Sequence, residues 1–569
     1  MKKFIFRLTQ KLIPWILLAG IAITVIWLFY FSPPEETRPE FVLNKFSHWL
    51  KLAVCLGWTT LLFAWLAHLR TWISGILLCL IFFTSAFFAF IGFKFKLAYS
   101  YGLMADIVQT HWQEAVGFID VPAVLSVVGF VAAMFALAFL LRKIRPSFPP
   151  RKIILRVAPV ILVGLVFLPI ISFGVFPSYR ILVPIRDFKL FVENDVEIFQ
   201  ELGKIEKQET ETTRVSDSEK TAPIVFLHIG ESVRADHAPF NGYVRNTMPR
   251  MQKEFENGNL ISFPKCVSFS TSTRLSVLGI LTPATVLDPV MRHGSFIPAL
   301  NQNGIATSGF FSKMGAGGGY YDSALMQITQ NLSEKTFSSG TSDSLFVPVR
   351  EKLAEATGQN FYLYYGEGAH VPATVYNRDR YEIFKPAAKN YAENEMRVNS
   401  YDNCLVATDD FCGNAIDALR DKNAVYIYVA DHGDMLGEDD YWSRCAPCYR
   451  RKEMRHVLFF IWCSEKFKQT NPEKYRVLVE NSKWLGIVSH DFIYPTVLSF
   501  YGIRTPYYDA RHDLLSPEAE PFPQELPDGE EFGPLRFERA SIRWQGMSTD
   551  KAVSEKRLRE REARRAKKN

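Results

Sequence analysis

The stretch IVFLHIGES, residues 224–232, is a short apolar run that ends in a glycine and an acid. Its length and lack of alternation favour a strand that is buried on both faces, as in a parallel sheet. Longer helical patterns separate further runs of this kind at Thr307–Phe311, Phe361–Tyr365, Ala424–Ala430 and Val457–Trp462. Buried strands that alternate with helices predict an α/β domain with a mostly parallel central sheet over residues 222–515.

Metal-ligand side chains follow three of these predicted strands. Glu231 follows the first, His370 comes shortly after the third, and Asp431 and His432 follow the fourth. Ligands of open α/β sheets bind at the carboxyl ends of the strands, so we expect these side chains to lie close together. A lone Asp-His pair is more often a surface ion pair, but three strand ends together favour a site. Two carboxylates and an imidazole suit Zn²⁺, which takes about four ligands.

A segment rich in hydroxyls could supply the fourth ligand. Residues 268–277 read SFSTSTRLSV and lead into a helical pattern. A hydroxyl there would lie near helix N-terminal amides, which favour a phosphate. Such a hydroxyl becomes a nucleophile only when a base or a metal lowers its pKa. A plain Ser/Thr helix cap fits the same pattern equally well.

The first third of the chain holds five long apolar runs. Each has roughly 18–24 residues, enough to cross a hydrocarbon core of about 30 Å as a helix. The runs are Leu12–Phe31, Leu50–Ala67, Trp72–Phe93, Val121–Leu141 and Ile153–Phe176. We therefore predict a five-helix transmembrane domain over residues 1–176, followed by a juxtamembrane helix and linker over residues 177–221.

The net charge of +6 reflects membrane topology rather than a binding surface for nucleic acid. Basic residues without acidic ones precede the first apolar run and fill the connections at 68–71 and 142–152. The positive-inside rule then places the N-terminus in the cytoplasm. Five crossings place everything after Phe176 on the outer side. No nucleic-acid partner is expected.

The end of the chain, residues 516–569, is predicted to be a disordered tail. It is Pro-rich and acidic over Ser516–Leu535 and basic over Lys551–Asn569, and neither composition can build a core. Contact of the basic stretch with anionic lipid headgroups is the alternative.

Four longer segments occur in an order that indicates a known family. They are residues 230–243 (GESVRADHAPFNGY), 271–277 (TSTRLSV), 401–411 (YDNCLVATDDF) and 431–438 (DHGDMLGE). Together they resemble the lipid A phosphoethanolamine transferases, which include the mobile colistin-resistance enzymes and belong to the alkaline phosphatase superfamily. The resemblance covers nearly the whole chain to about residue 500, including the membrane part.

This resemblance implies a zinc enzyme with a covalent intermediate. Thr273 aligns with the nucleophile that carries phosphoethanolamine, and also with a zinc ligand. Glu231, Asp431 and His432 align with the other ligands of that zinc. The implied reaction moves phosphoethanolamine from phosphatidylethanolamine to a glycolipid acceptor, with lipid A expected. It would take place on the periplasmic side of a bacterial inner membrane, in a protein expected to be a monomer.

The family resemblance also implies residues for a second metal or for the substrate phosphate. His370 resembles the histidine of the family's GSHGP segment, and Lys313 resembles a phosphate-facing lysine. This chain has Arg444 where relatives carry a further histidine. His456 could replace that histidine from elsewhere, so a second zinc is possible.

A third set of residues is implied for the lipid donor. Residues 108–115 (VQTHWQEA) resemble the family's LQTxxxEA segment. Asp106, Thr110 and Glu114 then fall on one helical face, which in the family meets the phosphoethanolamine headgroup. An ordinary polar helix face is the alternative.

Several other functions compete with this interpretation. A glycerol phosphate transferase of the lipoteichoic-acid-synthase type would share the fold and the threonine nucleophile. Core sugars, periplasmic glucans or other glycans could replace lipid A as the acceptor. A catalytically inactive membrane sensor also fits, because the histidine near Arg444 is missing. A sulfatase does not fit, because the chain has no CxPxR site for formylglycine.

Overall fold

A computed structural model describes most of the second half of the chain. The described residues are 128–129, 132, 211–215, 221–286, 293–312, 325, 328–338, 342–366, 368–370, 378–387, 394–438 and 452–522. Among them, no helix has the length and apolar character needed to cross a membrane. The predicted spans lie outside these residues, apart from three positions of the fourth span. So do the predicted donor-binding residues Asp106, Thr110 and Glu114, and also Lys313.

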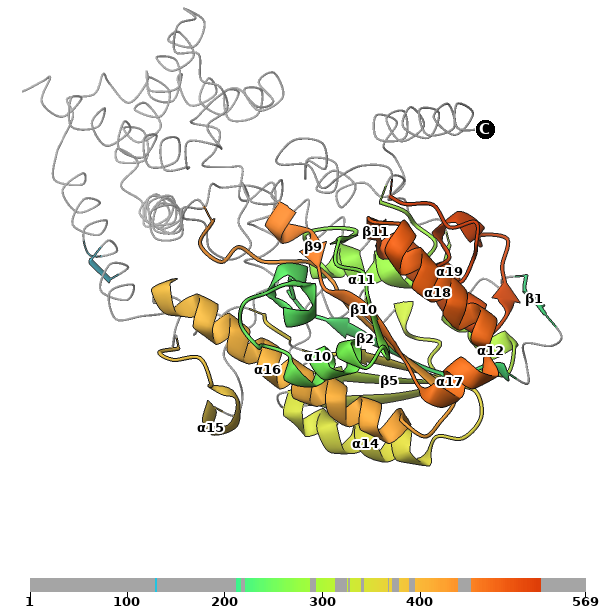
Figure 1. The fold of residues 1–569 in the computed structure, drawn as a ribbon, viewed down its shortest axis with the longest axis horizontal. Helices are drawn as coiled ribbons and strands as arrows, with labels where there is room; N and C mark the ends of the chain where they lie inside the picture. Colours follow the sequence, from blue (N-terminus) through green and yellow to red (C-terminus); the bar gives the residue numbers. More distant parts are fainter. Residues whose placement is uncertain are drawn as a thin grey trace, which may run out of the picture. The chain divides into compact units, whose positions relative to one another are not determined.

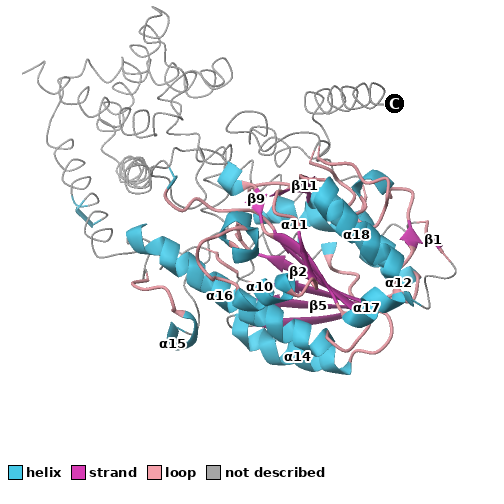
Figure 2. Cartoon of the chain, in the orientation of Figure 1, coloured by secondary structure: helices cyan, strands magenta, loops and turns pink. Residues whose placement is uncertain are grey.

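The chain divides into two compact units, and nearly all described residues belong to the second. At the centre of this unit is a sheet whose strands are drawn in magenta in Figure 2. It has seven strands in the order β3-β10-β8-β2-β7-β5-β6. Its strands are β2 (Ile224–Gly230), β3 (Leu260–Ser262), β5 (Ala306–Ser312), β6 (Glu334–Ser338), β7 (Asn360–Tyr365), β8 (Ala424–Ala430) and β10 (Phe459–Cys463). The run from β8 to β6 is parallel, whereas β10 is antiparallel to both its neighbours. The sheet is mixed, with the parallel centre that the sequence predicts.

Helices cover both faces of this sheet (Figure 1). On one face, α10 (Pro249–Glu256) and α14 (Phe346–Glu355) pack against the long α16 (Asn394–Leu419). The other face carries α11 (Thr273–Leu281), α12 (Ile297–Gln302), α18 (Pro472–Trp484) and α19 (Ile493–Phe500). Short elements complete the unit: β1 (Thr213–Arg214), α15 (Arg378–Tyr381), α17 (Glu465–Thr470), β12 (Ile503–Arg504), and the 3-10 helices η3 (Ala235–His237), η4 (Pro239–Asn241), η5 (Ser342–Leu345), η8 (Lys452–Met454), η9 (His490–Phe492) and η10 (Ala510–His512).

Strands β2 and β8 lie side by side in the middle of the sheet, and every residue of both is buried. Covering on both faces explains why their sequences are continuous apolar runs. Their register pairs Gly230 with Ala430, so the two strands end level. The side chains that follow each strand therefore emerge at the same edge.

The prediction of one strand over Val457–Trp462 in a parallel sheet is wrong. It is split at Leu458 into β9 (His456–Val457) and the antiparallel β10. The backbone N–H of Leu458 donates to Val233 O, and Leu458 O accepts from Ala430 N–H, so the chain changes partners there. Strand β9 joins β4 (Cys266–Val267) and β11 (Val488–Ser489) in a small second sheet.

The packed unit extends beyond both predicted boundaries, 222 and 515. Upstream, β1 lies in the predicted linker and pairs with β12. Downstream, Phe522 is buried and its N–H donates to Ile487 O. Ala519 is buried in the same core. The first residues of the predicted tail therefore belong to the folded unit.

Candidate active site

A strained turn at the end of β2 places the first acidic side chain. The glycine at 230 is required, because a Cβ atom there would lie 2.0 Å from the Tyr428 hydroxyl oxygen. Ser232 adopts a left-handed backbone with φ 60, which few non-glycine residues do. In this conformation the Ser232 hydroxyl donates to Glu231 Oε1 at 2.9 Å. The turn thereby directs the Glu231 carboxylate across the end of the sheet.

Asp431 and His432 follow β8 directly and meet that turn. Asp431 Oδ1 accepts the backbone N–H groups of Ser232 at 2.8 Å and of His432 at 2.7 Å. These two bonds link the segment after β2 to the segment after β8. They hold Oδ1 of Asp431 in place and leave its Oδ2 3.5 Å from His432 Nε2.

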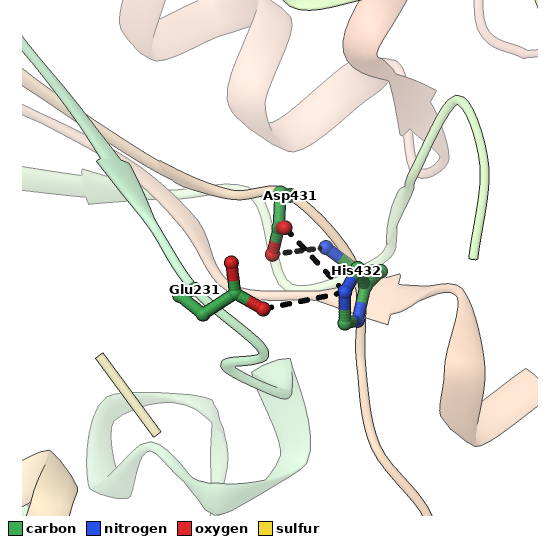
Figure 3. A group of neighbouring side chains, drawn as sticks. All are labelled: Glu231, Asp431 and His432. Atoms are coloured by element: carbon green, nitrogen blue, oxygen red, sulfur yellow. Dashed lines mark hydrogen bonds and ion pairs between the residues drawn. The ribbon is translucent and has the colours of Figure 1, made fainter. Parts of the chain in front are cut away.

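The three side chains form one compact group, shown in Figure 3. His432 Nε2 lies 3.4 Å from Glu231 Oε1 and 3.5 Å from Asp431 Oδ2. Within the described residues, these three form the only cluster of His, Cys, Asp and Glu ligand atoms that lie within 4.8 Å of one another. His432 Nδ1–H donates to Gly433 O at 2.7 Å, which assigns the lone pair to Nε2. All three side chains are buried.

Thr273 brings its hydroxyl into the same group. Its Oγ1 is 3.1 Å from His432 Nε2 and 3.2 Å from Glu231 Oε2. Thr273 is the first residue of α11, so its oxygen lies beside backbone N–H groups that the helix leaves unpaired. Of the two alternatives for the hydroxyl-rich segment, the structure favours a site over a plain cap, because Ser272 makes no side-chain cap bond.

The electrostatics of this group call for a cation. The ligand atoms of the two carboxylates lie within 4.8 Å of each other, and burial together with the Glu231 charge raises the pKa of Asp431 to about 7. Oδ2 of Asp431 is buried and has no hydrogen-bond partner among the described residues. A divalent metal ion would satisfy that oxygen and offset the like charges. Two carboxylates, an imidazole lone pair and a hydroxyl therefore fit a metal ion such as Zn²⁺.

His370 lies next to the cluster but is not part of it. The N–H of Ala369 donates to Glu231 O at 2.9 Å, which holds the 368–370 segment against the end of β2. A Cβ atom at Gly368 would lie 2.5 Å from the same carbonyl oxygen, and its φ of +51 also favours glycine. His370 is therefore carried to the rim of the site.

The other predicted histidine makes a different contact. His456 Nε2–H donates to Pro264 O at 2.6 Å, and the residue belongs to the small sheet. Like His370, it is outside the three-residue cluster.

Tyr365 contacts the cluster, and sequence reasoning missed it. Its hydroxyl donates to Glu231 Oε2 at 2.7 Å. It is the last residue of β7, the parallel neighbour of β2. Its position at a strand end could have identified it, but a tyrosine in an apolar strand gave no signal of its own.

Arg234, a buried arginine that the sequence analysis did not single out, links the segment after β2 to the segment after β8. Arg234 donates from Nε and Nη2 to both oxygens of Asp236, at 2.9 and 2.6 Å. Its Nη1 donates to Asp434 O at 3.1 Å and to Glu438 Oε1 at 2.5 Å. It therefore joins the chain after β2 to the chain after β8.

The segment 401–411 has a structural part to play. Asp402 on α16 is fully buried and accepts from His237 Nδ1–H at 2.8 Å, the Tyr243 hydroxyl at 2.9 Å and Arg245 Nη1 at 2.7 Å. We call these four residues the Asp402 clamp. The adjacent Tyr401 hydroxyl donates to Ser232 O at 2.7 Å. The clamp thus holds the chain that follows β2 against α16.

Two protein families match successive parts of the chain. The family described as "Phosphoethanolamine transferase EptA/EptB" matches residues 55–183, and the sulfatase family matches residues 223–503. Phosphoethanolamine transferase EptA of Escherichia coli K12 is 23% identical over 553 residues, which covers 90% of this chain and 98% of EptA. Phosphatidylethanolamine transferase Mcr-1 of Escherichia coli is 24% identical over 541 residues, covering 86% and 95%.

A solved structure with the same fold comes from Neisseria meningitidis. It is the integral membrane protein lipooligosaccharide phosphoethanolamine transferase A, with a TM-score of 0.65 and 18% identity. The alignment covers 89% of this chain and 99% of that one. Because the matches include both the region before residue 183 and the domain that holds Glu231, Asp431 and His432, the resemblance to the lipid A phosphoethanolamine transferases is confirmed.

Proposed function

We propose that this protein transfers phosphoethanolamine from phosphatidylethanolamine to lipid A or a related glycolipid, through a covalent intermediate on Thr273. The observation that carries the proposal is the position of Thr273 Oγ1, within 3.3 Å of His432 Nε2 and both Glu231 oxygens, at the start of a helix. A buried hydroxyl so placed has ligand atoms on one side and backbone N–H groups on the other. The relatives named above are phosphoethanolamine transferases, which supports this donor chemistry.

Glu231, Asp431, His432 and Thr273 would hold one zinc ion in this proposal. Bound there, the ion would lower the pKa of the threonine hydroxyl and offset negative charge on a phosphate oxygen. Glu231 and Asp431 are already oriented for this purpose by Tyr365 and by the N–H groups of Ser232 and His432.

In the first half-reaction, Thr273 Oγ1 attacks the phosphorus of phosphatidylethanolamine. A new bond forms between Oγ1 and phosphorus, and the bond from phosphorus to the diacylglycerol oxygen breaks. The threonine hydroxyl loses its proton in this step, and the departing diacylglycerol oxygen gains one, so the protons balance. The first N–H groups of α11 would orient the phosphoryl oxygens during this step.

In the second half-reaction, an oxygen of the acceptor, either a sugar phosphate or a hydroxyl, attacks the same phosphorus. The bond to Thr273 Oγ1 breaks, and the threonine takes the proton that a hydroxyl acceptor loses, or a proton from water when the acceptor is a phosphate. Positioning and charge supply most of the catalysis, since this transfer leaves little other covalent chemistry to the protein.

The remaining predicted residues belong to the same proposal. His370, at the rim beside Glu231, would contact the substrate phosphate or a second zinc. Lys313 and His456 are proposed for the same role on sequence grounds. Asp106, Thr110 and Glu114 are proposed to bind the donor headgroup.

The proposed organisation is a five-helix membrane domain over residues 1–176, a linker over 177–221, a catalytic domain over 222–515 and a tail, with residues 213–214 of the linker and 516–522 of the tail packed on the catalytic domain. We place the N-terminus in the cytoplasm and the catalytic domain in the periplasm. A lipid donor is then within reach of a site outside the inner membrane. Insertion of reporter fusions after residues 70, 148 and 221 would test this topology; an outward-facing reporter at 70 would contradict it.

The test of the mechanism is a pair of substitutions at the nucleophile. Thr273→Ala should abolish transfer to lipid A, whereas Thr273→Ser keeps a hydroxyl and should retain part of it. Mass spectrometry of the protein incubated with phosphatidylethanolamine should detect phosphoethanolamine on the peptide that holds residue 273, and mass spectrometry of the product should detect it on lipid A. Undiminished transfer by Thr273→Ala would exclude the mechanism. If phosphatidylglycerol leaves a glycerol phosphate adduct on residue 273 and phosphatidylethanolamine leaves none, the proposed donor is excluded.

A further inference from the structure

A buried histidine outside the ligand cluster joins the two segments that carry the nucleophile and the metal ligands. Residues 268–272, which we call the nucleophile loop, lead directly into Thr273. In this loop the backbone N–H of Phe269 donates to Nδ1 of His490 at 3.0 Å. On its other side, His490 Nε2–H donates to Ala430 O at 2.9 Å, immediately before Asp431. One imidazole therefore bridges the loop and the end of β8.

Both ring nitrogens of His490 are committed to these backbone groups. Nδ1 accepts and Nε2 donates, which determines a single neutral tautomer. The side chain is fully buried, and burial lowers its pKa to about 3, so the ring stays neutral in ordinary conditions. His490 begins η9, directly after β11, which pairs in parallel with β4 just before the loop. The bridge is thus supported by backbone on both sides.

Further hydrogen bonds hold the nucleophile loop to Arg455 and to Ser276 on α11. Arg455 Nη2 donates to Phe269 O at 3.0 Å. Ser276 Oγ accepts the N–H of Ser270 at 3.1 Å and donates to Ser270 O at 3.0 Å. The fit of the loop on α11 is close, because a Cβ atom at Gly279 would lie 2.2 Å from the Phe269 ring. His490 adds to these a direct hydrogen-bonded bridge from the loop to the end of β8.

We propose that His490 is a positioning residue that sets the place of the Thr273 hydroxyl relative to Asp431 and His432. This inference rests on the proposed function and deepens it, since it assigns the alignment of nucleophile and ligands to a residue that touches neither substrate nor metal. Displacement of a reacting group by about 1 Å can cost roughly 100-fold in rate. Loss of the bridge should accordingly slow attack by Thr273 and leave the ligands in place.

The test compares two buried histidines in the full-length, zinc-loaded protein. His490→Ala removes the bridge. His228→Asn is the matched control: His228 is also buried in the sheet, burial lowers its pKa to about 3, and Nδ1 bonds the Tyr426 hydroxyl at 2.6 Å, away from the cluster. For cleavage of phosphatidylethanolamine, His490→Ala should lower kcat about 100-fold, with KM and zinc content unchanged. The control should lose stability while kcat stays within about twofold of that of the unmodified protein.

Conservative variants separate the two halves of the bridge. His490→Asn places an acceptor oxygen near the Nδ1 position and should keep part of the rate. His490→Gln offers a donor near the Nε2 position and should do the same. These variants also carry the test if His490→Ala does not fold. The proposal would be overturned if His490→Asn and His490→Gln both had the kcat of the unmodified protein. It would also be overturned if kcat were equal in His490→Ala and in the His228→Asn control. Loss of zinc from His490→Ala would also overturn it, because the residue would then act on metal retention.

A readout independent of activity distinguishes this proposal from the proposed function. Amide hydrogen exchange of the peptide that holds Phe269 should accelerate at least tenfold in His490→Ala and stay unchanged in the control. If the unmodified protein forms no adduct on Thr273, the proposed function fails, and exchange alone decides on the bridge. Unchanged exchange in His490→Ala would exclude the bridge whatever the activity.

Discussion

Two fully buried aspartates, Asp402 and Asp431, have opposite surroundings. Asp402 is surrounded by donors: its two oxygens accept from His237, Tyr243 and Arg245. Asp431 faces a second carboxylate, and its Oδ2 has no hydrogen-bond partner in the described part of the chain.

The difference separates structure from chemistry. A buried carboxylate whose acceptors are all filled by the protein stabilises the fold and needs nothing further. A buried pair of like charges with an unfilled oxygen costs free energy until a cation binds. The hydrogen-bonding groups of the Asp402 clamp are therefore satisfied within the protein, whereas the Asp431 cluster offers an unfilled oxygen that a cation could bind. The following predictions test that contrast.

The largest effect should come from Asp431→Asn. The variant keeps Oδ1 for the N–H groups of Ser232 and His432 but removes the charge that a metal requires. Transfer should fall on the order of 10³-fold and zinc content should drop. After chelation, the variant should unfold at a higher temperature than the chelated unmodified protein, because the like charges are gone. Enzyme assays, metal analysis and thermal unfolding would measure these three effects. A lower unfolding temperature for the chelated variant would contradict the contrast.

The matching change in the clamp, Asp402→Asn, should act in the opposite direction. It leaves the Arg245 guanidinium and the Tyr243 hydroxyl facing an amide, so the protein should lose about 2–3 kcal/mol of stability. Zinc content should stay unchanged. Thermal unfolding with parallel metal analysis would measure this, and loss of zinc at unchanged stability would refute the assignment.

A smaller effect is expected from Tyr365→Phe. The change removes the hydroxyl that orients Glu231, and loss of a partner that orients a metal ligand weakens metal binding by about 10-fold or more. Competition with a zinc chelator would measure it. Tyr501→Phe is the control, because its hydroxyl bonds the carbonyl oxygen of Asn360, at the opposite end of β7 from Tyr365. Equal zinc affinities in the two variants would show that Tyr365 has no such effect.

The smallest effect is a pH dependence at the link between the two segments. Burial opposes ionisation of Asp236, but its hydrogen bonds to Arg234 lower its pKa from 3.8 to about 2. The stabilisation from this pair is therefore present above pH 3.8 and is lost as the pH falls toward 2. Between these pH values, the free energy of unfolding should rise more steeply with pH in the unmodified protein than in Asp236→Asn. Equal slopes of the free energy of unfolding against pH in the two proteins would show that the Arg234–Asp236 pair does not stabilise the fold.

The sequence predicted the cluster because its ligands follow strands with a recognisable pattern. Glu231, Asp431 and His432 come directly after buried apolar runs, and Thr273 ends a run of four consecutive hydroxyl residues, 270–273. Each of these signals is local, so each could be found without knowing which strands are neighbours. A mostly parallel sheet then followed from their buried character, whereas the pairing of β2 with β8 came from the structure.

Other features depended on contacts between distant parts of the chain. The split of the Val457–Trp462 run arises because Leu458 bonds Val233 and Ala430, and no local pattern records those partners. Tyr365 and His490 look like ordinary core residues in the sequence. Their importance lies in which backbone or carboxylate atoms they meet, and the folded chain alone decides that.

By itself, the sequence determined which candidate side chains follow the buried strands and which family the chain resembles, and that resemblance singled out one hydroxyl, Thr273. Residue type and short spacing suffice for this because they define the available atoms. The tertiary structure decided how those atoms are held. It showed that Asp402 is satisfied while Asp431 is not, and that one neutral imidazole relates the nucleophile loop to β8. Such differences come from long-range packing, which places partners that no local pattern specifies.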